Sequence, residues 1–432
     1  MTVSIMPGKI AGSISAIPSK SHLHRLLIYA ALSDKETQLL CAETEALDIK
    51  ATIGCLTALG AFIERQKEGF KVKPINFDYL QDKSKSSEAL VLPCKESGST
   101  LRFMLPIANA LGIFGAFHME GRLPERPMAP LDGQLKNHGI SLWRDTPEIL
   151  YCKGKLTAGD YQLPGDISSQ YISGLLMALP LLDNSSSLTV TEPLESADYI
   201  AMTLETAGIF GSKPLIKQSQ NQIQYEIQGK RFTSPGQAEV EGDWSNGAFW
   251  LCAGAMPGGD IKIRGLKKDS SQGDKELSTI LSQMGAGVSW QSDILHVSEK
   301  ERNHIEIDAR AIPDLIPVLA AVAALGNGTT IIRNAARLRL KESDRLLSTA
   351  NTLSALGADI EETEDGLKIK GKPKLKGGTV DAYGDHRIPM MAAIASAGCT
   401  EPVTVTGAQA VNKSYPAFWD DLVSLGKDIK FL

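Results

Sequence analysis

The stretch Leu353–Ile360 (LSALGADI) is one of six in this 432-residue chain in which a helix-like run ends at a glycine and apolar residues follow. Glycine is typical of the residue after a helix, because it adopts positive φ without strain. The apolar residues beyond it predict a strand. The six glycines lie 69 to 79 residues apart, at Gly60, Gly139, Gly208, Gly285, Gly357 and Gly426.

A second signal recurs in step with these glycines. Short polar segments, here called elbows, come directly before Ala/Leu-rich runs and lie 70 to 78 residues apart, at Ser21, Ser99, Ser169, Trp244, Asp314 and Asp385. Two signals with one period predict six copies of one α/β unit. The runs after the elbows are apolar on almost every side, which predicts buried helices. Segments such as SLTVTE (187–192) and TTIIRNA (329–335) predict strands between the helices.

The composition is that of a globular protein, with 43% hydrophobic and 22% charged residues. The length favours two domains, and KRFTSPGQ (230–237) is the expected crossing between them. KSKSSE (83–88) predicts an exposed loop. A net charge of −5 gives no reason to expect nucleic acid or an anionic membrane as partner. The six scattered cysteines and the absence of a leader-like N-terminus predict a cytoplasmic protein with reduced thiols and no zinc site.

The elbows also carry cations. A Ser or Asp before a helix is usually only a cap for the first N–H groups. However, Lys20 and Arg25 belong to the first elbow, Arg102 follows the second and Arg387 lies in the sixth. Long cations gain nothing from the dipole at a helix N-terminus, which instead attracts anions. Cations at these positions therefore predict a bound anion, which would contact both the cations and the helix N-termini.

Three further segments are rich in charge or prolines. GRLPERPM contains Arg126, RLRLKESDRLL contains Lys341, Glu342 and Arg345, and AVNKSYP contains Lys413. Alone, the second would be a solvated helix start with local ion pairs, and the third an ordinary loop. Together with the elbows, and in the same order over the full length, these segments resemble the 5-enolpyruvylshikimate-3-phosphate synthase family of enolpyruvyl transferases.

The resemblance implies transfer of the enolpyruvyl group of phosphoenolpyruvate to the 5-hydroxyl of shikimate 3-phosphate, with release of phosphate, in the shikimate pathway to the aromatic amino acids. It implies an α/β fold of two similar domains, each of three βαβαββ units forming an inside-out α/β barrel. Residues 20–235 would form one domain, and residues 1–19 with 236–432 the other. It implies no cofactor, a cytoplasmic monomer, two small-molecule substrates as partners, and glyphosate as inhibitor.

The resemblance also assigns roles to residues at matching positions. The implied catalytic residues are Lys20, Asp314 and Glu342. The implied contacts with shikimate 3-phosphate are Lys20, Ser21, Arg25, Ser168, Ser169, Gln170, Ser196, Tyr199, Asp314 and Lys341. The implied contacts with phosphoenolpyruvate are Lys20, Gly98, Arg102, Arg126, Gln170, Arg345, Arg387 and Lys413. No metal ligand is implied.

Two positions depart from the usual pattern. Arg337 stands where many relatives have Asn, and Phe103 stands where smaller or aliphatic residues are common, which predicts a reshaped wall behind Gly98. Asp243, in the fourth elbow, is expected to have a structural role only.

Two alternatives stay open. UDP-N-acetylglucosamine enolpyruvyl transferases share the fold and the donor, but they use a reactive loop cysteine, and GRLPERPM has none. A non-catalytic anion-binding scaffold would need the cations, but it would not need Asp314 and Glu342 as well.

Overall fold

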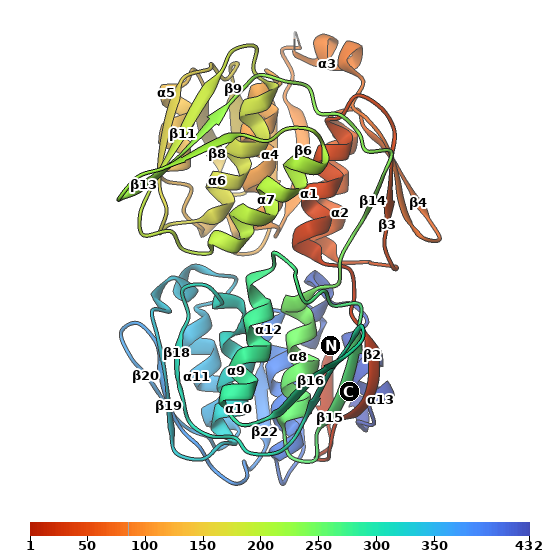
Figure 1. Cartoon of the computed structure of the whole chain (residues 1–432), viewed down its shortest axis with the longest axis vertical. Coiled ribbons are helices and arrows are strands. Elements are labelled where there is room, and N and C mark those ends of the chain that lie inside the picture. Colours follow the sequence, from red (N-terminus) through yellow and green to blue (C-terminus); the bar gives the residue numbers. More distant parts are fainter. Residues whose placement is uncertain (85) are drawn as a thin grey trace. The chain divides into compact units, whose positions relative to one another are not determined.

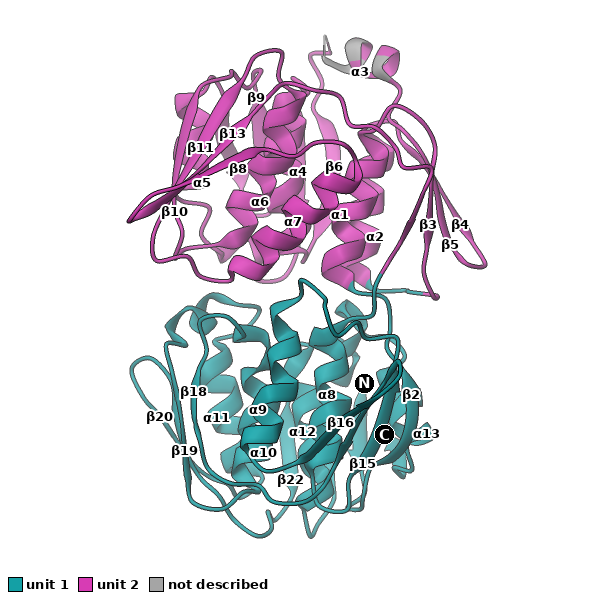
Figure 2. Ribbon diagram, viewed as in Figure 1, with its two compact units in different colours: residues 1–19, 44–46, 241–432 teal, residues 20–43, 47–240 magenta. Residues whose placement is uncertain are grey.

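A computed structural model describes all residues except Lys85, which belongs to the predicted loop 83–88 and lies outside the described residues. The chain divides into two compact units (Figure 2). Unit 1 comprises Met1–Ser19, Thr44–Ala46 and Glu241–Leu432, and unit 2 comprises Lys20–Glu43 and Leu47–Val240. The chain returns to unit 1 between Val240 and Glu241, which is later than the predicted boundary between residues 235 and 236. The expected crossing 230–237 lies within unit 2, where Ser234 Oγ is 2.6 Å from Thr37 Oγ1.

The strands of the described residues form six four-stranded sheets with one shared pattern (Figure 1). Each sheet begins with a parallel pair, and two antiparallel strands follow. The sheets of unit 2 are, in strand order, β14 (Gln237–Glu239), β3 (Thr37–Leu40), β5 (Gly69–Lys73) and β4 (Phe62–Gln66); β6 (Leu90–Lys95), β7 (Gly115–Met119), β9 (Ile149–Lys153) and β8 (Ser141–Thr146); and β10 (Asp160–Pro164), β11 (Ser186–Thr191), β13 (Gln222–Ile227) and β12 (Leu215–Gln218).

The sheets of unit 1 repeat this pattern. They are β2 (Ala11–Ser15), β15 (Asp260–Arg264), β17 (Ile294–Ser298) and β16 (Gly287–Gln291); β18 (Glu306–Asp308), β19 (Thr329–Arg333), β21 (Leu367–Lys370) and β20 (Asp359–Glu362); and β22 (Gly378–Asp381), β23 (Val403–Thr406), β1 (Thr2–Ile5) and β24 (Ile429–Phe431). The six equivalent sheets confirm the six-fold α/β repeat that the sequence predicts.

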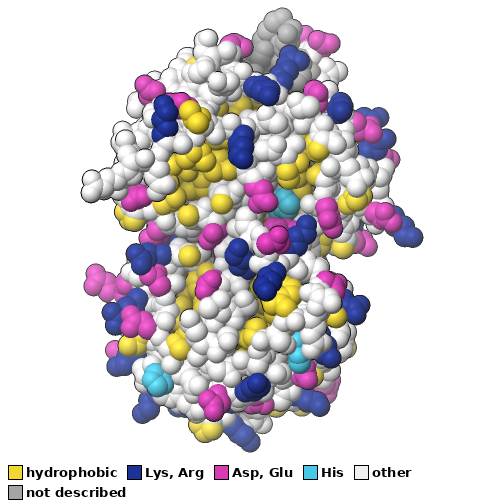
Figure 3. Space-filling model, viewed as in Figure 1, with side chains coloured by type: hydrophobic (Ala, Val, Ile, Leu, Met, Phe, Trp, Pro, Cys, Tyr) yellow, Lys and Arg dark blue, Asp and Glu magenta, His cyan; other side chains and the backbone are white. Residues whose placement is uncertain are grey.

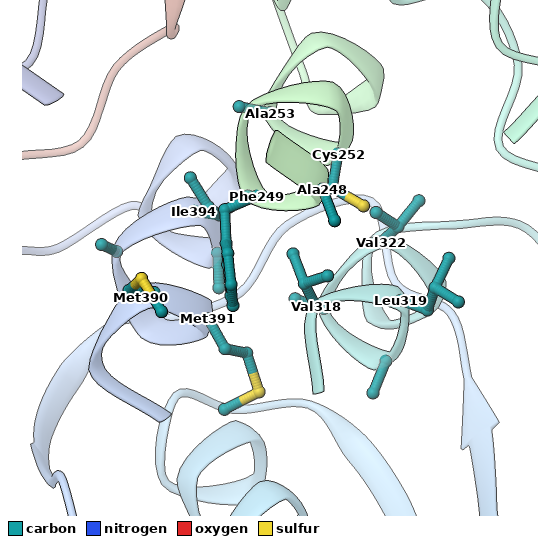
Figure 4. Packing of buried hydrophobic residues seen from close by; sticks show 14 of the residues in the cluster. Ala248, Phe249, Cys252, Ala253, Val318, Leu319, Val322, Met390, Met391 and Ile394 are labelled. Atoms are coloured by element: carbon teal, nitrogen blue, oxygen red, sulfur yellow. The ribbon is translucent and has the colours of Figure 1, made fainter. Parts of the chain in front are cut away.

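The six elbows open buried helices. These are α1 (Lys20–Ala31), α4 (Gly98–Ala110) and α6 (Ser169–Ala178) in unit 2, and α8 (Trp244–Ala255), α10 (Ile316–Ala324) and α12 (Arg387–Ala395) in unit 1. In unit 1 the last three pack together through fully buried side chains, among them Phe249, Val318 and Met391 (Figure 4). The remaining α-helices of the described chain are α2 (Leu47–Ala58), α3 (Phe77–Ser84), α5 (Leu131–Asn137), α7 (Ala197–Ile209), α9 (Leu277–Gln283), α11 (Arg345–Ala355) and α13 (Phe418–Ser424).

Five of the six periodic glycines follow a helix with φ between 93° and 97°, as predicted. The prediction was wrong for Gly208, which lies inside α7, because that helix continues to Ile209. Gly211, with φ of 73°, adopts the positive φ beyond this helix instead. A glycine at the expected interval therefore does not by itself end a helix.

The surface carries charges of both signs, which are interspersed over the visible face of each unit (Figure 3). Within the described part of the chain, we find no helix with the length and apolar character needed to cross a membrane. Five of the six cysteines are buried, and Cys41 is half-buried.

Candidate active site

In unit 2, four of the predicted phosphoenolpyruvate ligands lie around the start of α4. Arg102 Nη1 donates to Gln170 Oε1 at 2.9 Å, and Gln170 Nε2 donates to Ser99 Oγ at 2.9 Å. A methyl group placed on Gly98 would lie 2.6 Å from Arg102 Nη1 and 2.7 Å from Arg126 Nη1. The structure thus brings four of the predicted ligands together, namely Gly98, Arg102, Arg126 and Gln170.

Arg25 is hydrogen-bonded to two other residues that are predicted to contact shikimate 3-phosphate. Its Nη1 donates to the backbone oxygen of Ser21 at 2.7 Å, and its Nη2 donates to that of Tyr199 at 2.9 Å. Its guanidinium also lies over the Phe103 ring, 5.2 Å from the centroid. Phe103 therefore supports Arg25 of α1, and its ring also lies 6.4 Å from that of His24 in the same helix. That Phe103 reshapes the wall behind Gly98 stays a prediction.

Lys20 is the first residue of α1, and its Nζ lies 2.7 Å from Asp48 Oδ2 of α2. Asp48 is buried and was not predicted as a site residue. A lone Asp in the run ALDIK carries no local signal, and its lysine partner lies 28 positions away. The pair fixes the ammonium group of the predicted catalytic lysine.

The predicted serines lie at helix starts. Ser168 is the N-cap of α6, and its Oγ accepts a hydrogen bond from the N–H of Gln170. Ser169 is the first residue of the same helix. Ser196 precedes α7 in a left-handed conformation, with φ of 54°. Each hydroxyl therefore lies where helix N–H groups favour an anion.

In unit 1, Arg345 holds three carboxylates. Its Nη1 donates to Asp314 at 2.8 Å, its Nη2 donates to Glu342 at 2.6 Å, and its Nε donates to Asp385 at 2.8 Å. The Arg345 side chain is only 1% exposed. Charge-assisted hydrogen bonds in such a buried setting are strong and directional. The two predicted catalytic carboxylates of this unit are therefore held on one rigid cation.

Further cations surround these carboxylates. Lys341 Nζ lies 3.7 Å from Asp314, and Lys413 Nζ lies 3.8 Å from Glu342. Arg387 Nη1 donates to the backbone oxygen of Asp314 at 2.9 Å, and its Nη2 donates to Ser245 Oγ at 2.7 Å. The Nε of Arg387 is buried and has no hydrogen-bond partner among the described residues.

Burial and the neighbouring charges together shift the pKa values of Asp314 and Lys341. Burial alone would raise the pKa of Asp314, but Arg387, Lys341 and Arg345 outweigh it and hold that pKa well below the ordinary value. Burial lowers the pKa of Lys341 to about 8, although Asp314 opposes the shift. Asp314 is thus a permanent carboxylate near neutral pH, whereas Lys341 can exchange its proton only slightly above it.

Other residues of unit 1 were missed or only partly foreseen. Asp385 was recognised as an elbow, yet its bond to Arg345 was not predicted, because the two lie 40 positions apart. Ser245 was not predicted, since a serine after a helix cap carries no specific signal. Asp243 caps α8 by accepting from the Asn246 N–H at 2.7 Å, which is the structural role expected. Arg339 forms local ion pairs with Asp344 and Glu362.

Arg337, the other departure from the pattern, is hydrogen-bonded to the backbone oxygen of Arg310. Within the described residues, no group of three or more His, Cys, Asp or Glu side chains could hold a metal ion.

Six equivalent sheets around buried helices, with cations at the helix starts, define the enolpyruvyl transferase class of fold. The enolpyruvyl transferase NikO from Streptomyces tendae shares this fold, with a TM-score of 0.75 and 17% identity over 99% of this chain and 98% of the other. EPSP synthase from Acinetobacter baumannii matches with a TM-score of 0.78 and 25% identity over 100% of both chains.

The chain belongs to the EPSP synthase (3-phosphoshikimate 1-carboxyvinyltransferase) family, whose sequence pattern matches residues 5–422. It is 42% identical to 3-phosphoshikimate 1-carboxyvinyltransferase of Clostridium acetobutylicum over 431 residues, which cover 99% of this chain and 98% of the relative.

Proposed function

We propose that this protein transfers the enolpyruvyl group of phosphoenolpyruvate to the 5-hydroxyl of shikimate 3-phosphate and releases phosphate. The strongest single support in the geometry is the pair Asp314 and Glu342, both hydrogen-bonded to the buried Arg345 with lysines beside them. A scaffold that only binds anions has no use for two such carboxylates, since they repel its ligand. Full-length membership of the family supports the same activity.

Phosphoenolpyruvate is a small, highly charged anion, and its proposed ligands suit it. Arg102 and Arg126 flank Gly98 at the N-terminus of α4, where the helix dipole adds to their attraction. Arg387 is buried with its Nε–H unpaired among the described residues, so an anionic oxygen could accept that bond. The further proposed ligands are Lys20, Gln170, Arg345 and Lys413.

Shikimate 3-phosphate needs groups for a phosphate and for a ring with hydroxyls. Ser168 and Ser169, at the start of α6, suit the phosphate. Ser21 and Tyr199, joined through Arg25, suit the ring side. The remaining proposed contacts are Lys20, Gln170, Ser196, Asp314 and Lys341.

The reaction is an addition followed by an elimination. The 5-hydroxyl loses its proton and attacks C2 of phosphoenolpyruvate while C3 gains a proton, and the tetrahedral intermediate then loses a C3 proton as the C–O bond to phosphate breaks. We assign the hydroxyl proton to Asp314. Its cations keep it ionised, so it can accept a hydrogen bond from the 5-hydroxyl, and because its lowered pKa makes it a weak base, it takes the proton only as bond formation to C2 makes the hydroxyl acidic. We assign the proton transfers at C3 to Glu342 together with Lys20.

Turnover with both substrates tests this proposal. Phosphate release and the mass of the product are measured with phosphoenolpyruvate and either shikimate 3-phosphate or UDP-N-acetylglucosamine as acceptor. We expect product with shikimate 3-phosphate as the acceptor and no product with UDP-N-acetylglucosamine. Product from the sugar nucleotide would indicate the rival transferase, and binding without turnover would indicate a scaffold.

We further propose that the protein acts as a cytoplasmic monomer. One chain supplies every proposed site residue, and its cysteines are free thiols, mostly buried. Light scattering after size-exclusion chromatography tests the monomer, for which the expected mass is 46.4 kDa.

A further inference from the structure

Four polar side chains are buried where helix α2 packs against α1 and α4 (Figure 1). They are His24 of α1, Thr52 of α2, and Ser97 and Thr100 at the start of α4, and each is at most 1% exposed. The proposed reaction uses none of them. Burial of a polar group is costly unless the group is hydrogen-bonded, so the partners of these side chains indicate what they hold together.

Two contacts join α1 to α2, one helical turn apart. The first is the ion pair between Lys20 Nζ and Asp48 Oδ2, at 2.7 Å. The second joins His24 Nδ1 to Thr52 Oγ1, also at 2.7 Å. Within each helix the two residues are four positions apart, so they lie on one face. The contact of Thr52 with His24 therefore helps to hold in place the two helices that carry the ion pair.

The third helix is attached through Thr52 as well. Thr52 Oγ1 lies 2.8 Å from Thr100 Oγ1 of α4. Thr100 Oγ1 in turn donates to Ser97 Oγ at 2.8 Å, with the Asp48 backbone oxygen as a second acceptor at 3.4 Å. Ser97 Oγ also accepts from the Thr100 N–H at 3.2 Å and so caps α4. Thr52 is thus connected to the residue that directly precedes Gly98.

The hydrogen bonds of this network have one direction. A threonine hydroxyl has a single proton, and Thr100 donates its proton to Ser97 or to the Asp48 carbonyl. Thr100 can therefore only accept from Thr52, and the Thr52 oxygen must then accept from the Nδ1–H of His24. Because Thr52 both accepts and donates, an apolar side chain of the same shape would break both connections at once.

From this network we infer that Thr52 is a positioning residue for phosphoenolpyruvate. It fixes the start of α1, which carries Lys20, relative to the start of α4, which carries Gly98 and Arg102. The inference rests on the proposed function, because it takes these three residues as ligands of that substrate. Clearance is small there, since a methyl group on Gly98 would lie 2.6 Å from Arg102 Nη1. A small shift of α4 relative to α1 would therefore misplace the proposed ligands, although the buried Thr52 does not itself touch the substrate.

Thr52→Val tests the inference, because it removes the hydroxyl and keeps the shape of the side chain. Misplaced ligands predict a rise of about tenfold in KM for phosphoenolpyruvate, with a smaller change in kcat. The KM for shikimate 3-phosphate should change much less, since Ser168 and Ser169 lie at the start of α6, which supplies none of the network residues. Thr52→Ser restores a hydroxyl that accepts and donates, so it should return the KM for phosphoenolpyruvate to near the wild-type value.

Thr206→Val is the matched control. Thr206 is also a buried threonine of unit 2, and its Oγ1 donates to the Met202 backbone oxygen of its own helix, α7, at 2.7 Å. This substitution removes one buried hydroxyl, as Thr52→Val does, so thermal unfolding should show a loss of stability while both KM values stay near normal. Thr100→Val removes the next hydroxyl of the network. Its effect on KM should be less than additive with that of Thr52→Val, because both break the same contact.

An unchanged KM for phosphoenolpyruvate in Thr52→Val, an equal rise in Thr206→Val, or a failure of Thr52→Ser to restore the KM would overturn the inference. If Thr52→Val does not fold, Thr100→Val and its rescue by Thr100→Ser decide the same question. If the wild type shows no turnover, the proposed function fails instead. Calorimetric binding of phosphoenolpyruvate to the wild type and to Thr52→Val then decides the role of Thr52, and equal affinities would overturn it.

Discussion

Arg345 illustrates how strongly a single side chain can organise the proposed site. It binds Asp314, Glu342 and Asp385, which come from three separate segments of unit 1. Removing one partner of such a buried pair leaves the remaining charge without compensation, so substitutions here should preserve shape. Amide variants of the carboxylates meet that condition.

We expect Glu342→Gln and Asp314→Asn to lower kcat by about 100-fold or more, because each loses a proposed acid–base group. The KM for phosphoenolpyruvate should change far less. Steady-state kinetics with both substrates measures the two effects separately. Glu362→Gln is the control, since Glu362 pairs with Arg339, which is not among the proposed site residues, and should leave kcat near normal. Near-normal kcat in both active-site variants would contradict the assigned roles.

Gly98→Ala should raise the KM for phosphoenolpyruvate and weaken inhibition by glyphosate. The added methyl would lie 2.6 Å from the Arg102 guanidinium and 2.7 Å from that of Arg126, so both proposed ligands must move. Glyphosate inhibition at several phosphoenolpyruvate concentrations tests the shared pocket. Gly133→Ala, whose methyl would meet nothing within 4 Å, is the control. Inhibition that does not depend on phosphoenolpyruvate concentration would argue against a common site.

His24 should make the protein less stable in mild acid. Burial lowers the pKa of His24 from 6.5 to about 3, so between these values the unfolded chain binds a proton that the folded chain does not. Stability is therefore fully present above about pH 6.5 and falls as the pH decreases, by up to ~1.4 kcal/mol per pH unit from this residue. His24→Gln should flatten that slope. Urea unfolding between pH 7.5 and 5 measures it, and an unchanged slope in the variant would refute the assignment.

At the scale of elements, α4 and α6 pack so closely that their contact depends on a glycine. A Cβ on Gly174 of α6 would lie 2.3 Å from the backbone oxygen of Arg102 in α4 and 3.1 Å from Pro106. The same two helices carry Arg102 and Gln170, which are hydrogen-bonded to each other. The spacing of the helices thus sets the geometry of part of the proposed phosphoenolpyruvate site.

Gly174→Ala should therefore separate the two helices, at a cost of about 1–3 kcal/mol in stability, and should raise the KM for phosphoenolpyruvate. Gly208→Ala in α7 is the matched control, because its methyl would meet nothing within 4 Å. It should be neutral or stabilising, since Ala favours a helix by up to about 1 kcal/mol over Gly. Thermal unfolding and kinetics distinguish the two variants. Equal stability of both would show that the contact tolerates a methyl group.

The elements could be predicted from the sequence because their signals are local. A polar elbow before an apolar run, and a glycine after a helix, need only a few neighbouring residues to be recognised. The partners of the site residues could not be predicted, because Lys20 meets Asp48 and Arg25 meets Thr203 across 28 and 178 positions. Gly208 shows the limit of the local signal, since α7 runs past it to Ile209.

At the scale of the whole molecule, the chain begins and ends in unit 1. Strand β1 lies between β23 and β24, so both termini belong to one sheet. Between them the chain leaves at Ser19 and returns at Glu241 to complete unit 1. Each unit thus contributes its own set of proposed ligands, and the proposed function requires both sets to act on the same pair of substrates.

If cations of both units bind the same substrates, as the proposed function requires, they should repel each other until anions bind, so substrates are expected to make the molecule more compact. The proposed phosphoenolpyruvate ligands of unit 2 include Lys20, Arg102 and Arg126, and those of unit 1 include Arg345, Arg387 and Lys413. Small-angle scattering with shikimate 3-phosphate plus glyphosate should give a smaller radius of gyration than the free protein. Arg387→Ala should weaken this response, because glyphosate then loses one of its ligands in unit 1. An unchanged radius of gyration with both ligands at saturation would mean that the two sets of cations bind their ligands without any closure of the molecule.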